Sequence, residues 1–417
     1  MKKISRRSFL ELAGITAAAG ALAACGSSSG SAASAAGTDS AASTAGASGA
    51  ASTAAKTNQY SADGLGGYKI GFFYMPTTDS LSQAFHNALD YCAKLTNCEM
   101  VYYDMTSWGS EDISTAVETL VSNGCTGILL PIGYSPSLYE YMNDNKIYYC
   151  GMTRSYNDEI AKVTDNTEYC CGWVGDLGGD SGINVQNGYI MTKALYDKGC
   201  KNIAFVAGSE GETMNDERVL GIQKCAEEFG MNIVANYRGG DFTTGYSDIL
   251  ASFGSQLDGI ACCGGGSNGV AAIQAAGLSG KIKLVQVDSA GDETRDYLQA
   301  GLLTATFSGG STYMIDLYMQ VFNALSGADR LFNSGSRIVP EFNSFIVESV
   351  DDWDAAEYAT NASVPGGLLP DELYSMNSKC APGMTVEERE ALVEKYQATD
   401  YWNVTAISDR VKEYLGD

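Results

Sequence analysis

Histidine and basic residues are scarce in this sequence of 417 residues. It contains a single histidine, His86, and no two cysteines stand in a C-x-x-C spacing. Both features argue against a standard zinc site, and we expect neither a metal nor a cofactor. Lysine and arginine number 26 against 50 aspartates and glutamates, which gives a net charge of −24 at pH 7. So acidic a chain is repelled by nucleic acids and by anionic lipid surfaces, so neither is expected as a partner.

Cysteine, in contrast, is plentiful, with twelve residues that include the adjacent pairs Cys170-Cys171 and Cys262-Cys263. Neighbouring residues of a β-strand point to opposite faces of the sheet, so such pairs do not suit a framework of disulfides. Apart from Cys25, we expect the cysteines to be small buried hydrophobic residues with reduced thiols.

The N-terminus has the pattern of an export signal. Two lysines and two arginines among the first seven residues precede a largely apolar stretch, 10–24, which is too short for a permanent membrane helix. The stretch ends in Leu22-Ala23-Ala24-Cys25, which matches the lipobox of bacterial lipoproteins. We therefore expect residues 1–24 to be a signal peptide and Cys25 to carry a lipid. Because Ser5-Arg6-Arg7-Ser8-Phe9-Leu10 resembles a twin-arginine signal, the twin-arginine and general export routes both stay open.

The rest of the chain divides by its composition. Residues 25–67 are rich in Ser, Ala and Gly and are expected to form a flexible tether. From Tyr68 onward, short β-rich runs alternate with helical stretches, which is typical of βαβ units and parallel sheets. One series of strands and helices ends at Ile147–Cys150, before the glycine-rich break Gly172–Gly182, and a second series follows the break.

Two such series predict an α/β protein of two doubly wound parallel-sheet lobes joined by a hinge. The expected divisions are lobe 1 at 68–174, lobe 2 at 175–303, a return to lobe 1 and hinge at 304–350, and a C-terminal extension at 351–417. The extension contains two helical stretches, Val386–Tyr396 and Ala406–Leu415, and is expected to pack on one lobe.

One glycine-rich turn, 264–269, fits two catalytic motifs. It matches G-x-G-x-x-G, the dinucleotide-binding turn, and also G-x-S-x-G with Ser267 as the nucleophile. A hydrolase of that type needs a histidine after the serine, whereas His86 lies far earlier in the chain, and a nicotinamide cofactor would have to be retained outside the cell. We therefore expect no enzyme and no catalytic residue. The turn is interpreted as a strand-to-helix connection where small residues let a ligand approach backbone N–H groups.

Doubly wound sheets bind their ligands at the carboxyl ends of the strands. The positions that follow the predicted strands combine aromatic rings with forked donors and carboxylates, a set that suits a polyhydroxylated ligand. The expected ligand-binding residues are Thr78, Asp79, Tyr134, Arg154, Arg218, Phe242 and Asp288.

Several segments resemble the type 1 periplasmic-binding-protein superfamily, and specifically its sugar-binding lipoproteins of ABC transporters. The resemblance covers about 69–347. Its landmarks are Thr78-Asp79-Ser80-Leu81, Met152-Thr153-Arg154, Asn215-Asp216-Glu217-Arg218-Val219-Leu220-Gly221, Val285-Gln286-Val287-Asp288-Ser289 and Leu303-Thr304-Ala305-Thr306-Phe307. In the family, the positions of Arg154, Arg218, Phe242 and Asp288 contact sugar. The chain departs from the family's usual Asn and paired aromatics around Thr78 and from its usual Asn-Asp near Cys263, so the resemblance does not specify which sugar.

The resemblance implies a monomer that closes two lobes over a small sugar-like ligand and delivers it to a membrane permease of an ABC importer. Its localisation would be extracytoplasmic, on the cell membrane through the lipid anchor alone. Two alternatives stay open within the same fold: a receptor for nucleosides or autoinducers, and a sensory accessory protein that signals to a membrane kinase or chemoreceptor.

Overall fold

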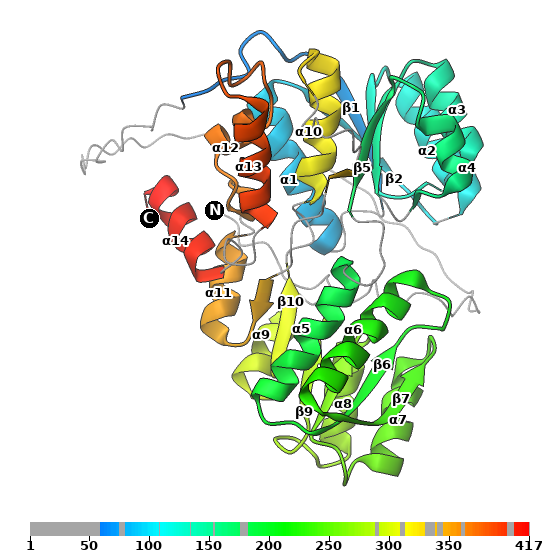
Figure 1. Ribbon diagram of the computed structural model, residues 1–417, viewed down its shortest axis with the longest axis vertical. Helices are drawn as coiled ribbons and strands as arrows, with labels where there is room; N and C mark the ends of the chain where they lie inside the picture. Colours follow the sequence, from blue (N-terminus) through cyan, green and yellow to red (C-terminus); the bar gives the residue numbers. More distant parts are fainter. Residues whose placement is uncertain are drawn as a thin grey trace, which may run out of the picture.

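The computed structural model describes residues 59–74, 80–107, 109–133, 135–152, 155–175, 182–287, 292–308, 313–329, 338–339, 345–359, 363–397 and 404–416. The expected signal peptide, Cys25 and the tether up to residue 58 lie outside these ranges. The described residues form two α/β lobes, one above the other in Figure 1, with a group of C-terminal helices along one side. No helix among them is long and apolar enough to cross a membrane.

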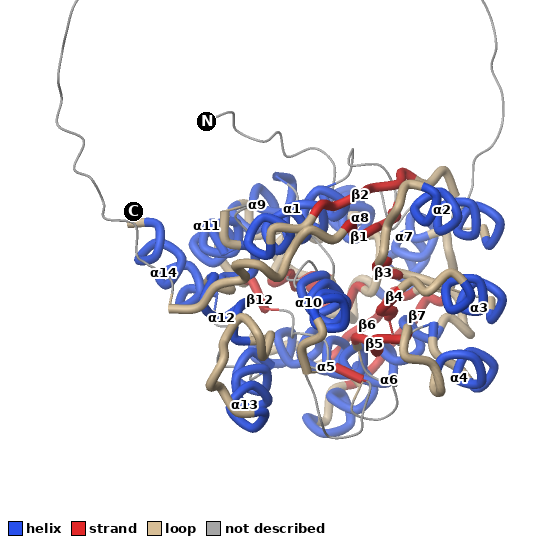
Figure 2. Tube along the Cα trace, turned by 90° about the horizontal axis from the view of Figure 1, so that it is seen from above, coloured by secondary structure: helices blue, strands red, loops and turns tan. Residues whose placement is uncertain are grey.

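Lobe 1 is built on a parallel sheet with the strand order β11-β5-β4-β3-β1-β2. Seen from above, α2, α3 and α4 lie on one side of its strands and α1 and α10 on the other (Figure 2). The strands are β1 (Lys69–Tyr74), β2 (Glu99–Asp104), β3 (Gly127–Leu130), β4 (Tyr148–Met152), β5 (Cys170–Val174) and β11 (Ile338–Val339). The helices are α1 (Ser80–Thr96), α2 (Ser110–Ser122), α3 (Pro136–Asp144), α4 (Asp158–Thr164) and α10 (Tyr313–Ser326).

Lobe 2 repeats this plan with the strand order β12-β10-β9-β8-β6-β7, in which β12 is antiparallel to β10 and the other pairs are parallel. Helices α5 and α6 cover one face of the sheet, and α7 and α8 cover the other. The strands are β6 (Asn202–Ala207), β7 (Asn232–Arg238), β8 (Gly259–Cys262), β9 (Lys283–Gln286), β10 (Ala305–Ser308) and β12 (Phe345–Val347). The helices are α5 (Ile183–Asp197), α6 (Thr213–Phe229), α7 (Phe242–Phe253), α8 (Gly266–Ala275) and α9 (Asp292–Gln299).

The side chains of the adjacent cysteines lie on opposite faces of their sheets, as neighbouring residues of a β-strand do. Cys170 packs in the hydrophobic core on one face of the lobe 1 sheet and Cys171 in the core on the other face. Cys262 and Cys263 divide between the two cores of lobe 2 in the same way. All cysteines in the described ranges but Cys98 are buried, and none of them is in a disulfide bond. The expectation of buried cysteines is therefore confirmed for this part of the chain.

The two-lobed fold class is confirmed, but some of its expected elements are corrected. The first series does not end at Ile147–Cys150, because β5 follows and extends into the glycine-rich break expected at Gly172–Gly182. The return segment expected at 304–350 is shared between the lobes: β10 and β12 belong to the sheet of lobe 2, and β11 belongs to lobe 1. The chain therefore crosses between the lobes once more after α10, from β11 to β12.

The C-terminal extension contacts both lobes, which corrects the expectation that it packs on one. It consists of α11 (Val350–Ala359), the 3-10 turn η2 (Pro365–Gly367), α12 (Pro370–Ser375), α13 (Val386–Gln397) and α14 (Val404–Leu415). Helix α11 packs against α9 and β12 of lobe 2, whereas η2 packs against α1 of lobe 1. Helix α14 packs against both α11 and η2, so the helices run alongside the two lobes (Figure 1).

Candidate functional site

The described part of the candidate site lies in lobe 2, at the carboxyl ends of its parallel strands, where such sheets bind ligands. Of the expected ligand-binding residues, Arg218 and Phe242 are in the described ranges. The others, and the lipidation residue Cys25, lie outside them: Thr78, Asp79, Tyr134, Arg154 and Asp288.

Arg218 lies in the second turn of α6 and is 4% exposed. Its Nη1 donates to the carbonyl oxygen of Cys263 over 3.4 Å. Cys263 directly follows β8, so the guanidinium reaches from the start of one helix to the end of a neighbouring strand. A buried forked donor in this place suits a ligand with several hydroxyl or carboxylate oxygens.

Phe242, the first residue of α7, reaches the same β8–α8 turn as Arg218. A Cβ atom on Gly264 or on Gly265 would lie 2.6 Å from an atom of the Phe242 side chain, so both positions require glycine for close packing. Gly265 also has a φ of +67°, which glycine adopts without strain. The structure therefore brings Arg218 and Phe242 together around residues 263–265.

The small residues of this turn also make room for a second side chain of the protein. A Cβ atom on Gly266 would lie 1.4 Å from Oε1 of Gln286, a residue of β9 that is 2% exposed. The glycines of the turn thus also admit side chains of the protein itself, the Phe242 ring and Gln286, and the expected approach of a ligand to its backbone stays a prediction.

Asn215 and Glu212 lie at the start of α6, next to Gly208, which directly follows β6. Nδ2 of Asn215 donates to Oε2 of Glu212 over 2.8 Å, while Oδ1 of Asn215 is buried and makes no hydrogen bond. A buried amide oxygen without a donor is costly, by about 1–3 kcal/mol, unless a partner arrives. The space here is narrow, because a Cβ atom on Gly208 would lie 2.2 Å from Oε2 of Glu212.

Arg238, the last residue of β7, fastens the loop between β6 and α6. Its Nε donates to the carbonyl of Gly208 over 2.7 Å, and its Nη2 donates to the carbonyl of Ser209 over 3.1 Å. The same Nη2 lies 2.5 Å from Oδ1 of Asp216. The hydrogen bond from Arg238, with that from the Gly211 amide, holds the pKa of the Asp216 carboxyl below its ordinary value of 3.8. A charged pair therefore fixes the loop that leads into Asn215 and Arg218.

The sole histidine does not serve a catalytic serine in this site. The His86 ring, on α1 of lobe 1, stacks on Tyr102 of the edge strand β2 with 3.8 Å between ring centroids. Ser267, in contrast, lies in the first turn of α8 in lobe 2. This arrangement gives no support to a G-x-S-x-G hydrolase, which needs the base within hydrogen-bonding distance of the nucleophile. No group of three or more His, Cys, Asp or Glu side chains placed to hold a metal occurs among the described residues.

Asn215 and Gln286 were named from the sequence only as parts of family landmarks, not among the expected ligand-binding residues, and Arg238 was not named. A signal for Gln286 existed, because a polar residue interrupts the apolar run Leu284–Val287 of a buried strand. Arg238 also stands at the carboxyl end of a predicted strand, Ile233–Tyr237, where functional side chains gather. The bond of Arg238 to Asp216 could not be anticipated, since it depends on how two loops of lobe 2 meet.

Comparisons with known proteins agree with this fold. Residues 183–329 match a family described as "Periplasmic binding protein domain", and this segment includes Arg218 and Phe242. The matching family is thus one of periplasmic, extracytoplasmic binding proteins. No curated protein sequence matches the chain.

Solved structures with the same two-lobed fold bind sugars according to their titles. A periplasmic solute-binding protein from Actinobacillus succinogenes 130z with bound D-allose is 15% identical, covers 68% of this chain and 98% of its own, and has a TM-score of 0.55. The periplasmic binding protein component of the arabinose ABC transporter from Shewanella sp. ANA-3, bound to L-arabinofuranose, is 16% identical. The match covers 69% of this chain and 93% of that protein, with a TM-score of 0.55. A periplasmic ribose transporter protein from Conexibacter woesei DSM 14684 is 15% identical, covers 73% and 97%, and has a TM-score of 0.55. At these identities the likeness confirms the type 1 periplasmic-binding-protein fold expected from the resemblance.

Proposed function

We propose that this protein, which has the fold of type 1 periplasmic binding proteins, is the extracytoplasmic substrate-binding lipoprotein of an ABC importer. It binds a sugar or sugar-like small molecule between its lobes as a monomer and passes it to a membrane permease. It carries out no chemical step. The lipid on Cys25 and the tether keep it at the outer face of the cell membrane. The tether is shorter than the expected 25–67, because residues 59–67 pack on lobe 1 and the C-terminal extension.

The observation that supports sugar binding most directly is the convergence of Arg218 and Phe242 on the turn after β8. A buried guanidinium donates to several oxygens at once, and an aromatic ring offers a flat apolar face to the C–H side of a sugar. Asp288 from lobe 2, with Thr78, Asp79, Tyr134 and Arg154 from lobe 1, completes the proposed set. Ligands named in the titles of structural relatives, D-allose and L-arabinofuranose, are of this chemical class.

The proposed mechanism is a shift of populations between open and closed forms. A ligand that contacts both lobes binds the closed form better than the open one and so stabilises closure. The closed form then presents surfaces of both lobes in one arrangement, which a permease recognises. Specific delivery thus needs no energy source within the binding protein itself.

A thermal-shift screen of the purified mature protein against pentoses, hexoses, nucleosides and amino acids tests the ligand class, with calorimetry of any ligand that raises Tm. We expect saturable stabilisation by at least one sugar. Replacing Arg218 with Ala should weaken the Kd for that ligand about 10- to 100-fold, the effect of losing hydrogen bonds from a charged donor. Gln223→Ala, an exposed position on the same helix, is the matched control and should leave Kd unchanged.

Because Arg218 is buried, Arg218→Lys serves as a second variant that keeps the charge but loses the forked geometry. Stabilisation by nucleosides alone would favour the receptor alternative. Failure of every class to raise Tm, or equal affinity in the wild type and in a folded Arg218→Ala protein, would contradict the proposed site.

A further inference from the structure

The C-terminal extension is attached firmly to lobe 1. The hydroxyl of Tyr91, on α1, donates to the carbonyl of Leu368 over 2.6 Å, and the hydroxyl of Tyr374, on α12, donates to the carbonyl of Leu95 over 3.1 Å. Nδ2 of the buried Asn377 donates to Oδ1 of Asn323, on α10, over 2.8 Å. Buried hydrogen bonds of this kind leave unpaired polar groups when broken, so this attachment resists separation.

The same extension is attached to lobe 2 through α11. This helix follows β12, the edge strand of the lobe 2 sheet, after two residues. Arg295, on α9, makes a two-pronged ion pair with Asp354, with distances of 2.9 Å from Nε to Oδ1 and 3.2 Å from Nη2 to Oδ2. Trp353 of α11 is 4% exposed and shares a buried cluster with Val347 of β12, so apolar burial adds to the ion pair.

Helix α14 joins the two attachments. Its Arg410 lies 2.5 Å from Oε1 of Glu372, on α12, and also donates to the carbonyl of Gly367 in η2. A Cβ atom on Gly367 would lie 2.5 Å from Cγ2 of Ile407, so α14 packs directly on the backbone of η2. Since α14 also packs on α11, one helix contacts the parts of the extension held by lobe 1 and by lobe 2.

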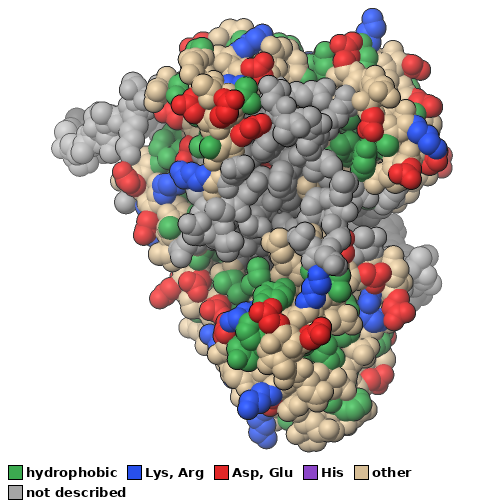
Figure 3. Space-filling view, in the orientation of Figure 1, with side chains coloured by type: hydrophobic (Ala, Val, Ile, Leu, Met, Phe, Trp, Pro, Cys, Tyr) green, Lys and Arg blue, Asp and Glu red, His purple; other side chains and the backbone are tan. Residues whose placement is uncertain are grey.

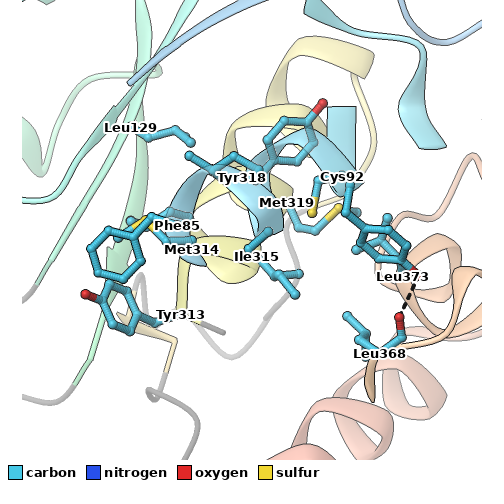
Figure 4. Close-up of a cluster of buried hydrophobic side chains, with 14 of the residues drawn as sticks. Phe85, Cys92, Leu129, Tyr313, Met314, Ile315, Tyr318, Met319, Leu368 and Leu373 are labelled. Atoms are coloured by element: carbon cyan, nitrogen blue, oxygen red, sulfur yellow. Dashed lines mark hydrogen bonds between the residues drawn. The ribbon is translucent and has the colours of Figure 1, made fainter. Parts of the chain in front are cut away.

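The apolar interior is continuous along this route. A single cluster of buried side chains includes Phe85 and Tyr318 of lobe 1, Ile407 of α14, and Trp353 and Val347 on the lobe 2 side. Figure 4 shows its centre, where side chains of α1 and α10 face Leu368 and Leu373 of the extension. Lobes joined only by crossing strands can separate by bending those strands, whereas here separation also has to expose packed apolar surface.

We propose that the C-terminal extension is an interlobe brace, which limits how far the lobes separate and thereby regulates the affinity of the ligand site. The effect on affinity rests on the proposed function, whereas the restraint on opening does not. A protein that binds ligand in its closed form has an apparent Kd equal to the intrinsic Kd divided by the closed fraction. By restricting the open range, the brace raises that fraction and tightens binding.

The test compares two arginines of the extension that make the same kinds of bond. Arg410 bonds Glu372 and the carbonyl of Gly367 and so joins α14 to α12 and η2. Arg389, on α13, bonds Asp329 and the carbonyl of Met384 and, within the described part of the chain, makes no bond to α14. Small-angle X-ray scattering of the ligand-free mature protein should show a larger radius of gyration for Arg410→Ala than for the wild type. Arg389→Ala should lower Tm without changing the scattering curve.

Arg410→Ala should also weaken ligand binding several-fold, chiefly through faster dissociation, while Arg389→Ala keeps the wild-type Kd. If Arg410→Ala does not fold, Ile407→Ala, which removes apolar contact with η2, replaces it with the same expected increase in radius. An unchanged radius of gyration in folded Arg410→Ala and Ile407→Ala proteins would overturn the brace. Because scattering needs no ligand, that failure is separate from a failure to find any sugar that binds.

Discussion

At the scale of single residues, Arg238 is notable because it touches no expected ligand position and yet holds the loop that precedes several of them. The carbonyls of Gly208 and Ser209 and the carboxylate of Asp216 all accept from its guanidinium. Its side chain is 12% exposed, so water screens these bonds less than it would those of a surface pair. We infer that Arg238 is a positioning residue, which orients Asn215 and Arg218 before a ligand arrives.

Replacing Arg238 with Met should therefore weaken ligand affinity more than it lowers stability. We expect a Kd about tenfold weaker, in the range for loss of a charged hydrogen bond, because the loop then samples arrangements that do not bind. Calorimetry gives Kd and thermal unfolding gives Tm. Arg238→Lys, which keeps one bond to Asp216, should recover part of the affinity. A fall in Tm with no change in Kd would contradict a positioning role.

The depressed pKa of Asp216 predicts how this affinity depends on pH. The carboxylate form pairs with Arg238, so the stabilising effect is fully present above the ordinary pKa of 3.8 and is lost as pH falls through the lower folded value. Ligand affinity measured from pH 8 downward should stay flat to the ordinary pKa of 3.8 and decline only below it, as the folded carboxyl takes up its proton. In the Asp216→Asn variant, which has no proton to gain, the affinity should be weaker at neutral pH and lack this part of the acid decline.

At the scale of elements, the close packing of α5 on α6 sets the position of Arg218. A Cβ atom on Gly188 would lie 1.9 Å from the carbonyl oxygen of Arg218, and one on Gly221 would lie 1.9 Å from that of Val185. Glycines in both helices thus let the two backbones touch. Nδ2 of Asn184 donates to Oε2 of Glu217 over 3.0 Å and joins the helices near their first turns.

A methyl group at either glycine should push the helices apart. Gly221→Ala should lower the free energy of unfolding by about 1–3 kcal/mol, as overpacking does, despite the roughly 1 kcal/mol that alanine favours in a helix. It should also weaken ligand binding, because Arg218 moves with α6. Chemical denaturation measures the first effect, and Glu227→Ala, exposed on α6, is the control. An unchanged free energy of unfolding in Gly221→Ala would contradict the close packing of α5 on α6.

Sequence patterns located several helices close to their observed bounds. The helices expected at 386–396 and 406–415 correspond to α13 and α14, although α13 is largely polar. Strand β5 was missed because Gly172, at its centre, made the sequence look like the start of a glycine-rich break. The packing of Phe242 on Gly264 and of α14 on η2 joins residues far apart in the chain, which local patterns do not encode. Of the expected ligand residues, Arg218 and Phe242 lie at the same turn, and the ligand-binding role of all of them stays a prediction.

At the scale of the whole molecule, the negative charge is spread over both lobes, as Figure 3 shows for one face. Electrostatic attraction therefore does not hold such a protein at an anionic membrane, and the proposed lipid on Cys25 would supply the attachment. We expect Cys25→Ser to move the protein from the membrane fraction to the soluble fraction or the medium. Ligand affinity should be unchanged, because the tether separates the anchor from the lobes. Membrane retention of the Cys25→Ser protein would contradict the lipid anchor.

The buried free thiols have a practical consequence. Burial raises the pKa of Cys125 and Cys200 to about 11 and that of Cys225 and Cys380 to about 12, so these thiols hardly ionise at neutral pH. Only the thiolate reacts with maleimide dyes, so a cysteine introduced on the surface would be labelled selectively in an otherwise natural chain, with the partly exposed Cys98 replaced first. A dye placed at the rim of one lobe would then report closure as a change in fluorescence. The same burial that fills the cores thus makes this chain a ready scaffold for an optical biosensor.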